Sequence, residues 1–95
     1  MTAPDVTITR QGEAAGAFTL RVGAAAAGRL DFRREAGILW IDYVVVEPSF
    51  RGRGLGVPLV AAAVAWARET GDRVSPVCGY ARRVLEAEPA WRDVR

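Results

Sequence analysis

Some residue types are missing from this chain of 95 residues, and their absence excludes several kinds of chemistry. There is no histidine and no lysine, and Cys78 is the single cysteine. Without histidine, one chain cannot form a serine–histidine or cysteine–histidine pair for nucleophilic catalysis, and it cannot build a histidine-based metal site. A single cysteine also excludes an intrachain disulfide and a paired-cysteine zinc site. We therefore expect no bound metal.

Charge and hydropathy narrow the class of protein further. The net charge is only +2, which does not predict a nucleic-acid partner. No apolar run approaches the roughly 20 residues that a membrane helix needs, and residues 1–10 lack the basic, apolar and small-residue sections of a signal peptide. We expect a cytoplasmic protein with no membrane partner. A chain of this length predicts one small domain, residues 1–95.

The first half of the chain predicts four β-strands. Alternating and β-branched segments occupy residues 6–9, 17–22 and 28–34, and residues 23–27 form a turn before the third strand. The longest apolar segment, 38–46, alternates little, which predicts a central strand that is buried on both faces. Because the connections between these strands are short, we expect an antiparallel meander.

The second half predicts a helix, a strand and a second helix. Pro58 fits the first turn of a helix that Gly71 ends. Residues 74–77 form a short edge strand, and residues 79–87 form a short helix, after which Trp91 packs back. A right-handed strand–helix–strand crossover places the last strand parallel to the fourth. The expected fold is therefore mixed α+β.

A glycine-rich turn joins the longest strand to the first helix. It consists of Arg51, Gly52, Arg53, Gly54, Leu55 and Gly56. Glycine lets a backbone approach a ligand closely, a helix N-terminus attracts anions, and arginine binds phosphate through a bidentate fork. From these residue types alone, a phosphate site and a simple connection without a ligand are equally good interpretations.

The turn resembles a motif of a known family. Val46, Pro48, Arg51, Gly54 and Gly56 match V-x-P-x-x-R-x-x-G-x-G, which resembles the acetyl-CoA-binding motif of the GNAT superfamily of N-acetyltransferases. The wider resemblance runs from residue 18 to residue 91 and is to the small, single-domain branch of that superfamily. It implies a GNAT-like fold in which the meander is followed by the crossover and a short C-terminal helix.

The resemblance also implies a cofactor and its contacts. It implies that acetyl-CoA is the acyl donor and that an amine, which the sequence does not identify, is the acceptor. Backbone groups of Val44, Val45 and Val46 are implied to bind the pantetheine arm, and those of residues 51–56 the pyrophosphate. Both a monomer and a homodimer remain open.

Cys78 and Tyr80 are two candidates for a catalytic role. Residues 74–80 resemble the V-P-L-C-P-F segment of the small branch, with Cys78 at the cysteine. A helix N-terminus and nearby arginines lower a thiol pKa, so this thiol is a candidate to accept the acetyl group or to protonate the departing CoA thiolate. A buried structural cysteine is the alternative. Tyr80 is a rival acid, because many larger members carry a tyrosine near the start of this helix.

Tyr43 is a third candidate, since it stands where the small branch carries a histidine. Its phenol can hydrogen-bond, but an ordinary pKa near ~10 makes it a poor base at neutral pH. Simple alternation places Asp42 on one strand face with Val44. If burial there raises its pKa, Asp42 is a candidate base. The alternative is that Asp42 is a charged surface residue.

The sequence thus favours one function and leaves another open. The leading hypothesis is an acetyl-CoA-dependent N-acetyltransferase whose catalytic candidates are Cys78, Tyr80 and Tyr43. The alternative is a non-catalytic module that binds CoA or acyl-CoA, or a protein partner. The absence of histidine keeps this alternative open.

Overall fold

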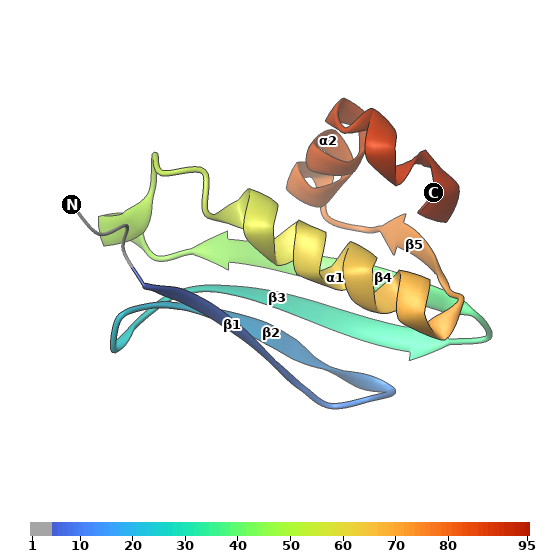
Figure 1. Ribbon diagram of the computed structural model, residues 1–95, viewed down its shortest axis with the longest axis horizontal. Helices are drawn as coiled ribbons and strands as arrows, with labels where there is room; N and C mark the ends of the chain where they lie inside the picture. Colours follow the sequence, from blue (N-terminus) through green and yellow to red (C-terminus); the bar gives the residue numbers. More distant parts are fainter. Residues whose placement is uncertain (1–4) are drawn as a thin grey trace.

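The computed structural model describes residues 5–95, in which the strands form one mixed sheet (Figure 1). The five strands lie side by side in chain order: β1 (Val6–Gln11), β2 (Ala15–Val22), β3 (Ala25–Glu35), β4 (Ile38–Val46) and β5 (Arg73–Pro76). Neighbouring strands from β1 to β4 are antiparallel, whereas β5 runs parallel to β4. The predicted meander with a parallel last strand is confirmed.

The helices of the described residues all follow β4. They are η1 (Pro48–Phe50), α1 (Gly56–Thr70), α2 (Gly79–Ala87) and η2 (Pro89–Val94), where η marks a 3-10 helix. In Figure 1, α1 runs along the sheet as the crossover from β4 to β5, and α2 and η2 lie beyond it, above the end of the sheet that carries β5. The predicted mixed α+β fold is confirmed.

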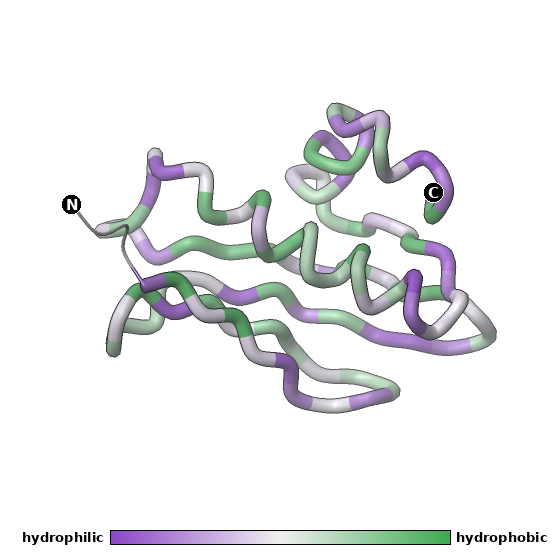
Figure 2. The backbone as a smooth tube through the Cα atoms, in the orientation of Figure 1, coloured by the Kyte–Doolittle hydropathy of each residue, from purple (hydrophilic) through white to green (hydrophobic). Residues whose placement is uncertain are grey.

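One hydrophobic core lies between a face of the sheet and both α-helices. Its largest fully buried side chains are Leu20, Leu30, Phe32, Leu39 and Ile41 of the sheet, Leu59, Val60 and Val64 of α1, and Leu85 of α2. Trp91 packs against this core as predicted. Figure 2 shows hydrophobic residues following β4 as far as the turn, where hydrophilic residues begin. This dense packing fixes β4, α1 and α2 relative to one another.

The prediction that β4 is buried on both faces is wrong, although its place inside the sheet is confirmed. Leu39 and Ile41 are fully buried on the helix side, but Trp40 and Asp42 on the other face remain partly exposed. The Arg33 guanidinium lies 5.1 Å above the centre of the Trp40 ring. An arginine therefore shields this apolar face, because both α-helices belong to the core on the opposite side.

The start of the third strand also differs from the prediction. β3 begins at Ala25 instead of residue 28, because Gly23 adopts a left-handed φ of 59° and closes a tight hairpin. The preference of alanine for helices is overridden by pairing with β2. α1 begins at Gly56, and Pro58 lies in its first turn, as expected for a residue whose missing N–H costs nothing there.

Candidate active site

The middle of β4 contains a β-bulge. Tyr43 pairs with Asp31 of β3, whereas Ile41 pairs with the next residue of β3, which leaves Asp42 as an extra residue between them. The bulge interrupts the alternation of side chains, so Ile41 and Val44 both pack against the core. Asp42 therefore does not share a face with Val44, and the prediction based on simple alternation is wrong.

The bulge also marks the place where β4 and β5 separate. β5 pairs with β4 only from Ile38 to Ile41, and the N–H groups of Val77 and Cys78 then both donate to the carbonyl of Ile41, at 2.9 and 3.2 Å. Beyond this point the chain turns into α2. Within the described part of the chain, residues 42–46 therefore have no strand partner on the edge that faces away from β3.

Arg51 indicates which backbone groups of β4 face this open edge. Its Nε donates to the carbonyl of Val46 at 3.1 Å, so that carbonyl points away from β3. The N–H of Glu47, one residue later, donates to the carbonyl of Ala27 at 2.8 Å and therefore points the other way. Because backbone groups alternate along an antiparallel strand, Val44 also presents its N–H and C=O to the open edge.

A groove of about 410 Å³ lies between the open edge of β4, the glycine-rich turn and the start of α2. We call it the β4 groove. Its lining comprises residues 43–46 of β4, Phe50 at the end of η1, residues 51, 52 and 54–56 of the turn, and Tyr80 of α2. It contains every residue that the sequence assigned to the cofactor except Arg53. Strand, turn and helix thus converge on one concave surface.

The glycines of the turn serve two different purposes. Gly52 and Gly54 adopt left-handed φ values of 85° and 69°, which side chains disfavour. Gly56 has an ordinary φ but lies against Tyr80, so that a Cβ placed there would come within 2.6 Å of the tyrosine ring. Two glycines therefore shape the backbone, and the third makes room for an aromatic side chain from α2.

The turn carries N–H groups with no partner inside the protein. Within residues 5–95, no acceptor is hydrogen-bonded to the N–H groups of residues 52–56, whereas those of Phe50, Arg51 and Val57 donate to carbonyls of the same segment. α1 has no side-chain cap at Leu55 and no acidic residue in its first turn. Its N-terminal partial charge is therefore uncompensated, an arrangement suited to phosphate oxygens.

The two arginines of the turn are held differently. The hydrogen bond from Arg51 to Val46 keeps the Arg51 side chain against the groove. The Arg53 guanidinium instead lies 5.1 Å from the centre of the Phe50 ring, outside the lining. Sequence reasoning missed Phe50 as a lining residue, although an apolar side chain just before the first arginine of the turn was a usable signal.

The predicted catalytic residues fall into two groups. Tyr43 and Tyr80 line the β4 groove; Tyr43 is 56% exposed and Tyr80 is half-buried. Cys78 is not in the lining. It occupies the N-cap of α2, half-buried against the core, and its side chain makes no capping hydrogen bond. The structure thus brings the two tyrosines to one groove and leaves the cysteine outside its lining.

Asp42 forms a two-pronged ion pair across the sheet. The Nε and one terminal nitrogen of Arg33 donate to its two carboxylate oxygens at 2.7 and 2.8 Å. These hydrogen bonds hold the pKa of Asp42 below its usual range, against the smaller opposing effect of burial. The hypothesis that burial raises this pKa is therefore wrong, and Asp42 is a weak base.

Comparison with protein families identifies the chain. The family of GCN5-related N-acetyl-transferases matches residues 17–94, and the chain therefore belongs to this family. Among curated protein sequences, none matches the chain. The family resemblance predicted from the turn motif is confirmed.

Solved structures with the same fold include one of similar size. A GCN5-like protein from Staphylococcus aureus, solved by NMR, is 27% identical, with a TM-score of 0.71 over 99% of this chain and 89% of that chain. The ribosomal-protein-S18-alanine N-acetyltransferase from Escherichia coli is 18% identical, with a TM-score of 0.69 over 81% of this chain and 53% of that chain.

A third structure with this fold holds a CoA derivative. It is AAC(6')-Iy in complex with a bisubstrate analog, CoA-S-monomethyl-acetylneamine; it is 23% identical, with a TM-score of 0.64 over 81% of this chain and 62% of that chain. At this identity the likeness establishes the fold alone. The chain spans less than two thirds of this protein and of the Escherichia coli enzyme.

Residues 5–95 contain no candidate metal centre and no candidate membrane helix. No group of three or more histidine, cysteine, aspartate or glutamate side chains in this range is arranged to hold a metal ion. No helix in it is long and apolar enough to cross a membrane.

Proposed function

We propose that the chain binds acetyl-CoA in the β4 groove and transfers the acetyl group to an amine. The observation that carries this proposal is the set of N–H groups at residues 52–56, which have no acceptor within residues 5–95 and stand at one end of the groove. Such donors at a helix N-terminus bind phosphate oxygens. Membership of the GCN5-related family supports a pyrophosphate-bearing acyl donor.

The open edge of β4 supplies the second set of contacts. In this proposal the N–H and C=O groups of Val44 and Val46 pair with the amide groups of the pantetheine arm, which lies along β4 like an added strand. Arg51, held at the end of that edge by Val46, adds positive charge where the arm meets the pyrophosphate. These contacts depend mainly on backbone atoms.

The side chains of the groove have the following proposed roles. When bound, acetyl-CoA supplies a thioester whose carbonyl carbon an amine attacks; the C–N bond forms, the C–S bond breaks, the amine loses a proton and the sulfur gains one. Tyr80 donates the proton to the sulfur and regains one from solvent, and Tyr43 hydrogen-bonds the amine. Asp42 is paired with Arg33, so the proton of the amine passes to water. Cys78 has a structural role.

A non-catalytic CoA-binding module is the second candidate. The ion pair of Asp42 favours it, because it removes as a base the carboxylate that adjoins Tyr43 in the sequence. In this case the β4 groove binds CoA and acetyl-CoA, but no amine accelerates the release of thiol.

Calorimetric titration with acetyl-CoA tests binding, and a matched pair of glycine variants tests its location. Gly54→Ala and Gly37→Ala both place a side chain at a left-handed φ, 69° and 78°, with no atom within 4 Å of the new Cβ. Both variants should lose about 1 kcal/mol of stability. Only Gly54→Ala should weaken binding, by about tenfold or more, because only Gly54 belongs to the β4 groove.

Two outcomes would count against these proposals. If acetyl-CoA at millimolar concentration gives no binding heat, the β4 groove is not a CoA site. In a second test, acetyl-CoA binds, and peptide, polyamine and small-molecule amines are added. If no amine raises the release of thiol above the rate without protein, the chain is a non-catalytic binding module and the transferase proposal is wrong.

A further inference from the structure

The outer edge of β1 has no strand partner within residues 5–95. β1 is the first strand of the sheet, and in Figure 1 it lies at the margin opposite β5. The N–H of Gly23 donates to the carbonyl of Asp5 at 2.8 Å, so that carbonyl faces β2. Because backbone groups alternate along an antiparallel strand, Val6, Ile8 and Arg10 present their N–H and C=O groups to the outside. These groups form a regular row along the edge of the sheet.

β1 lacks most of the features that prevent an edge strand from pairing with another chain. Lysine, proline and β-bulges commonly protect such edges. The register between β1 and β2 is continuous, however, and the strand VTITRQ contains no proline and a single charged residue, Arg10. The opposite margin of the sheet is different, because β5 has four residues, ends at Pro76, and has α2 and η2 packed beside it. β1 is therefore available to a further strand along its whole length.

The edge of β1 is complementary to itself. When two copies pair antiparallel about a twofold axis at Ile8, each Ile8 lies opposite its counterpart, and each Val6 lies opposite Arg10 of the other copy. Thr7 then lies opposite Thr9, and threonine pairs across strands are favourable. A centre at Thr7 or Thr9 instead leaves Arg10 or Val6 opposite a residue outside β1. Only the register centred on Ile8 pairs every outward-facing residue of the strand.

We propose that two copies of this chain associate edge to edge through β1 and form one continuous sheet. Each outward N–H then donates to a carbonyl of the other copy, as in an ordinary antiparallel ladder. The twofold axis uses both β1 edges and leaves none for a third copy, so the assembly is closed. A contact of one six-residue strand on each side is small, and we therefore expect a reversible dimer. The β4 groove contains no residue of β1, so this inference is independent of the proposed function.

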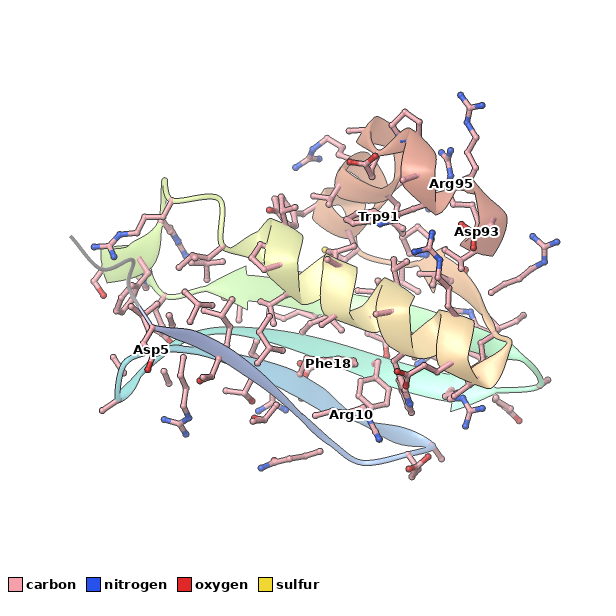
Figure 3. The ribbon with its side chains drawn as sticks, viewed as in Figure 1. Asp5, Arg10, Phe18, Trp91, Asp93 and Arg95 are labelled. Carbon is pink, nitrogen blue, oxygen red and sulfur yellow. The ribbon has the colours of Figure 1, made fainter. Side chains whose placement is uncertain are left out.

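Val6 offers a test of the register, because it meets Arg10 only across the dimer axis. Within one chain the two residues are separated by about 13 Å along the strand. Figure 3 shows Arg10 beside Phe18 and well away from Asp5, the residue before Val6. The Arg10 guanidinium lies 4.1 Å from the centre of the Trp66 ring, which holds it at its own end of β1. A charge introduced at Val6 therefore acts on Arg10 of the second copy.

Sedimentation at protein concentrations up to about 1 mM measures the dimerisation of wild type and variants. Val6→Glu should tighten the dimer by about three- to tenfold, because an opposite charge then faces Arg10 at both ends of the contact. Val6→Arg should weaken it by a similar factor through like charges. Val77→Glu and Val77→Arg are the matched controls. Val77 is also exposed, but it follows β5 at the opposite margin, so both variants should dimerise like the wild type.

Hydrogen exchange at low and high protein concentration tests the edge itself. The N–H groups of Val6, Ile8 and Arg10 should become protected as the concentration rises, whereas those of Thr7 and Thr9, which face β2, should be protected at both. A monomer at every concentration would overturn the inference. A dimer in which Val6→Glu and Val6→Arg behave alike, or in which the three outward N–H groups stay unprotected, would place the contact elsewhere and also overturn it.

Discussion

The two ends of the β4 groove are built from different atoms. At the turn, the backbone N–H groups of residues 52–56 have no acceptor within residues 5–95, and glycines set the backbone conformation. At the bulge, the available groups are side chains: Tyr43 is exposed, and Asp42 is tied to Arg33. The backbone conformation of the turn end therefore depends mainly on its glycines, whereas the chemistry of the bulge end depends on the identity of each side chain.

This difference explains how a binding groove and its chemistry can change independently. The family resemblance implies a histidine in the small branch where this chain has Tyr43, yet the groove that Tyr43 lines keeps the turn and the open strand edge. A substitution at the bulge end leaves the backbone donors in place. We expect substitutions at the turn end to alter stability and affinity, and those at the bulge end to alter turnover.

The largest effect is expected from Gly56→Val at the turn end. The new side chain would overlap the Tyr80 ring in a buried position, which should cost about 2–3 kcal/mol of unfolding free energy and expel the ring from the groove. Chemical denaturation measures the cost. The double variant Gly56→Val/Tyr80→Ala should recover much of the loss, because the two residues share one space; simple additivity of the two single losses would contradict this contact.

The next largest effect concerns Tyr80, which reaches the β4 groove from α2. Tyr80→Phe removes only the hydroxyl, so it should lower the rate of acetyl transfer by about ten- to a hundredfold and leave the affinity for acetyl-CoA within a factor of two. Thiol release at saturating acetyl-CoA measures the rate. Cys78→Ala is the control and should retain the wild-type rate. If the cysteine variant loses activity and the tyrosine variant keeps it, the proton donor is Cys78.

The sequence predicted the turn end better than the bulge end for a physical reason. Glycines at alternate positions, an apolar strand before them and Pro58 after them are local signals, and they located the turn and its helix correctly. The left-handed φ angles of Gly52 and Gly54 follow from the same signal. The same local patterns gave the four-stranded meander and the parallel last strand.

The bulge end could not be predicted from local patterns. A bulge is a property of two paired strands, and no residue near Asp42 marks it. Asp42 and Arg33 are nine residues apart, and they pair only because the β3–β4 register places them together. The contact between Gly56 and Tyr80 likewise joins two helices. Such contacts between distant residues can be predicted only once the tertiary structure is known.

A smaller effect is expected when only the charge at the turn end changes. Arg51→Gln should weaken CoA binding by about three- to fivefold, since the backbone N–H groups remain and the lost cation is exposed. Arg53→Gln is the matched control, because Arg53 lies over Phe50 outside the lining, and it should change affinity less than twofold. Calorimetry at low and high salt measures the affinity of each variant for CoA. A larger loss of affinity for Arg53→Gln than for Arg51→Gln would show that Arg53, instead of Arg51, contacts the ligand.

The smallest effect is expected at the bulge end, from Asp42→Asn. Since the folded state lowers the pKa of Asp42, its ion pair stabilises the fold above the ordinary aspartate pKa of about 3.9, and this contribution is lost as the pH falls through the lowered pKa. The half-exposed pair should contribute less than about 1 kcal/mol at neutral pH. Denaturation of wild type and variant should therefore differ at neutral pH and converge in acid. Thiol release should be nearly unchanged, and a loss beyond about tenfold would identify Asp42 as the base that takes the proton of the amine.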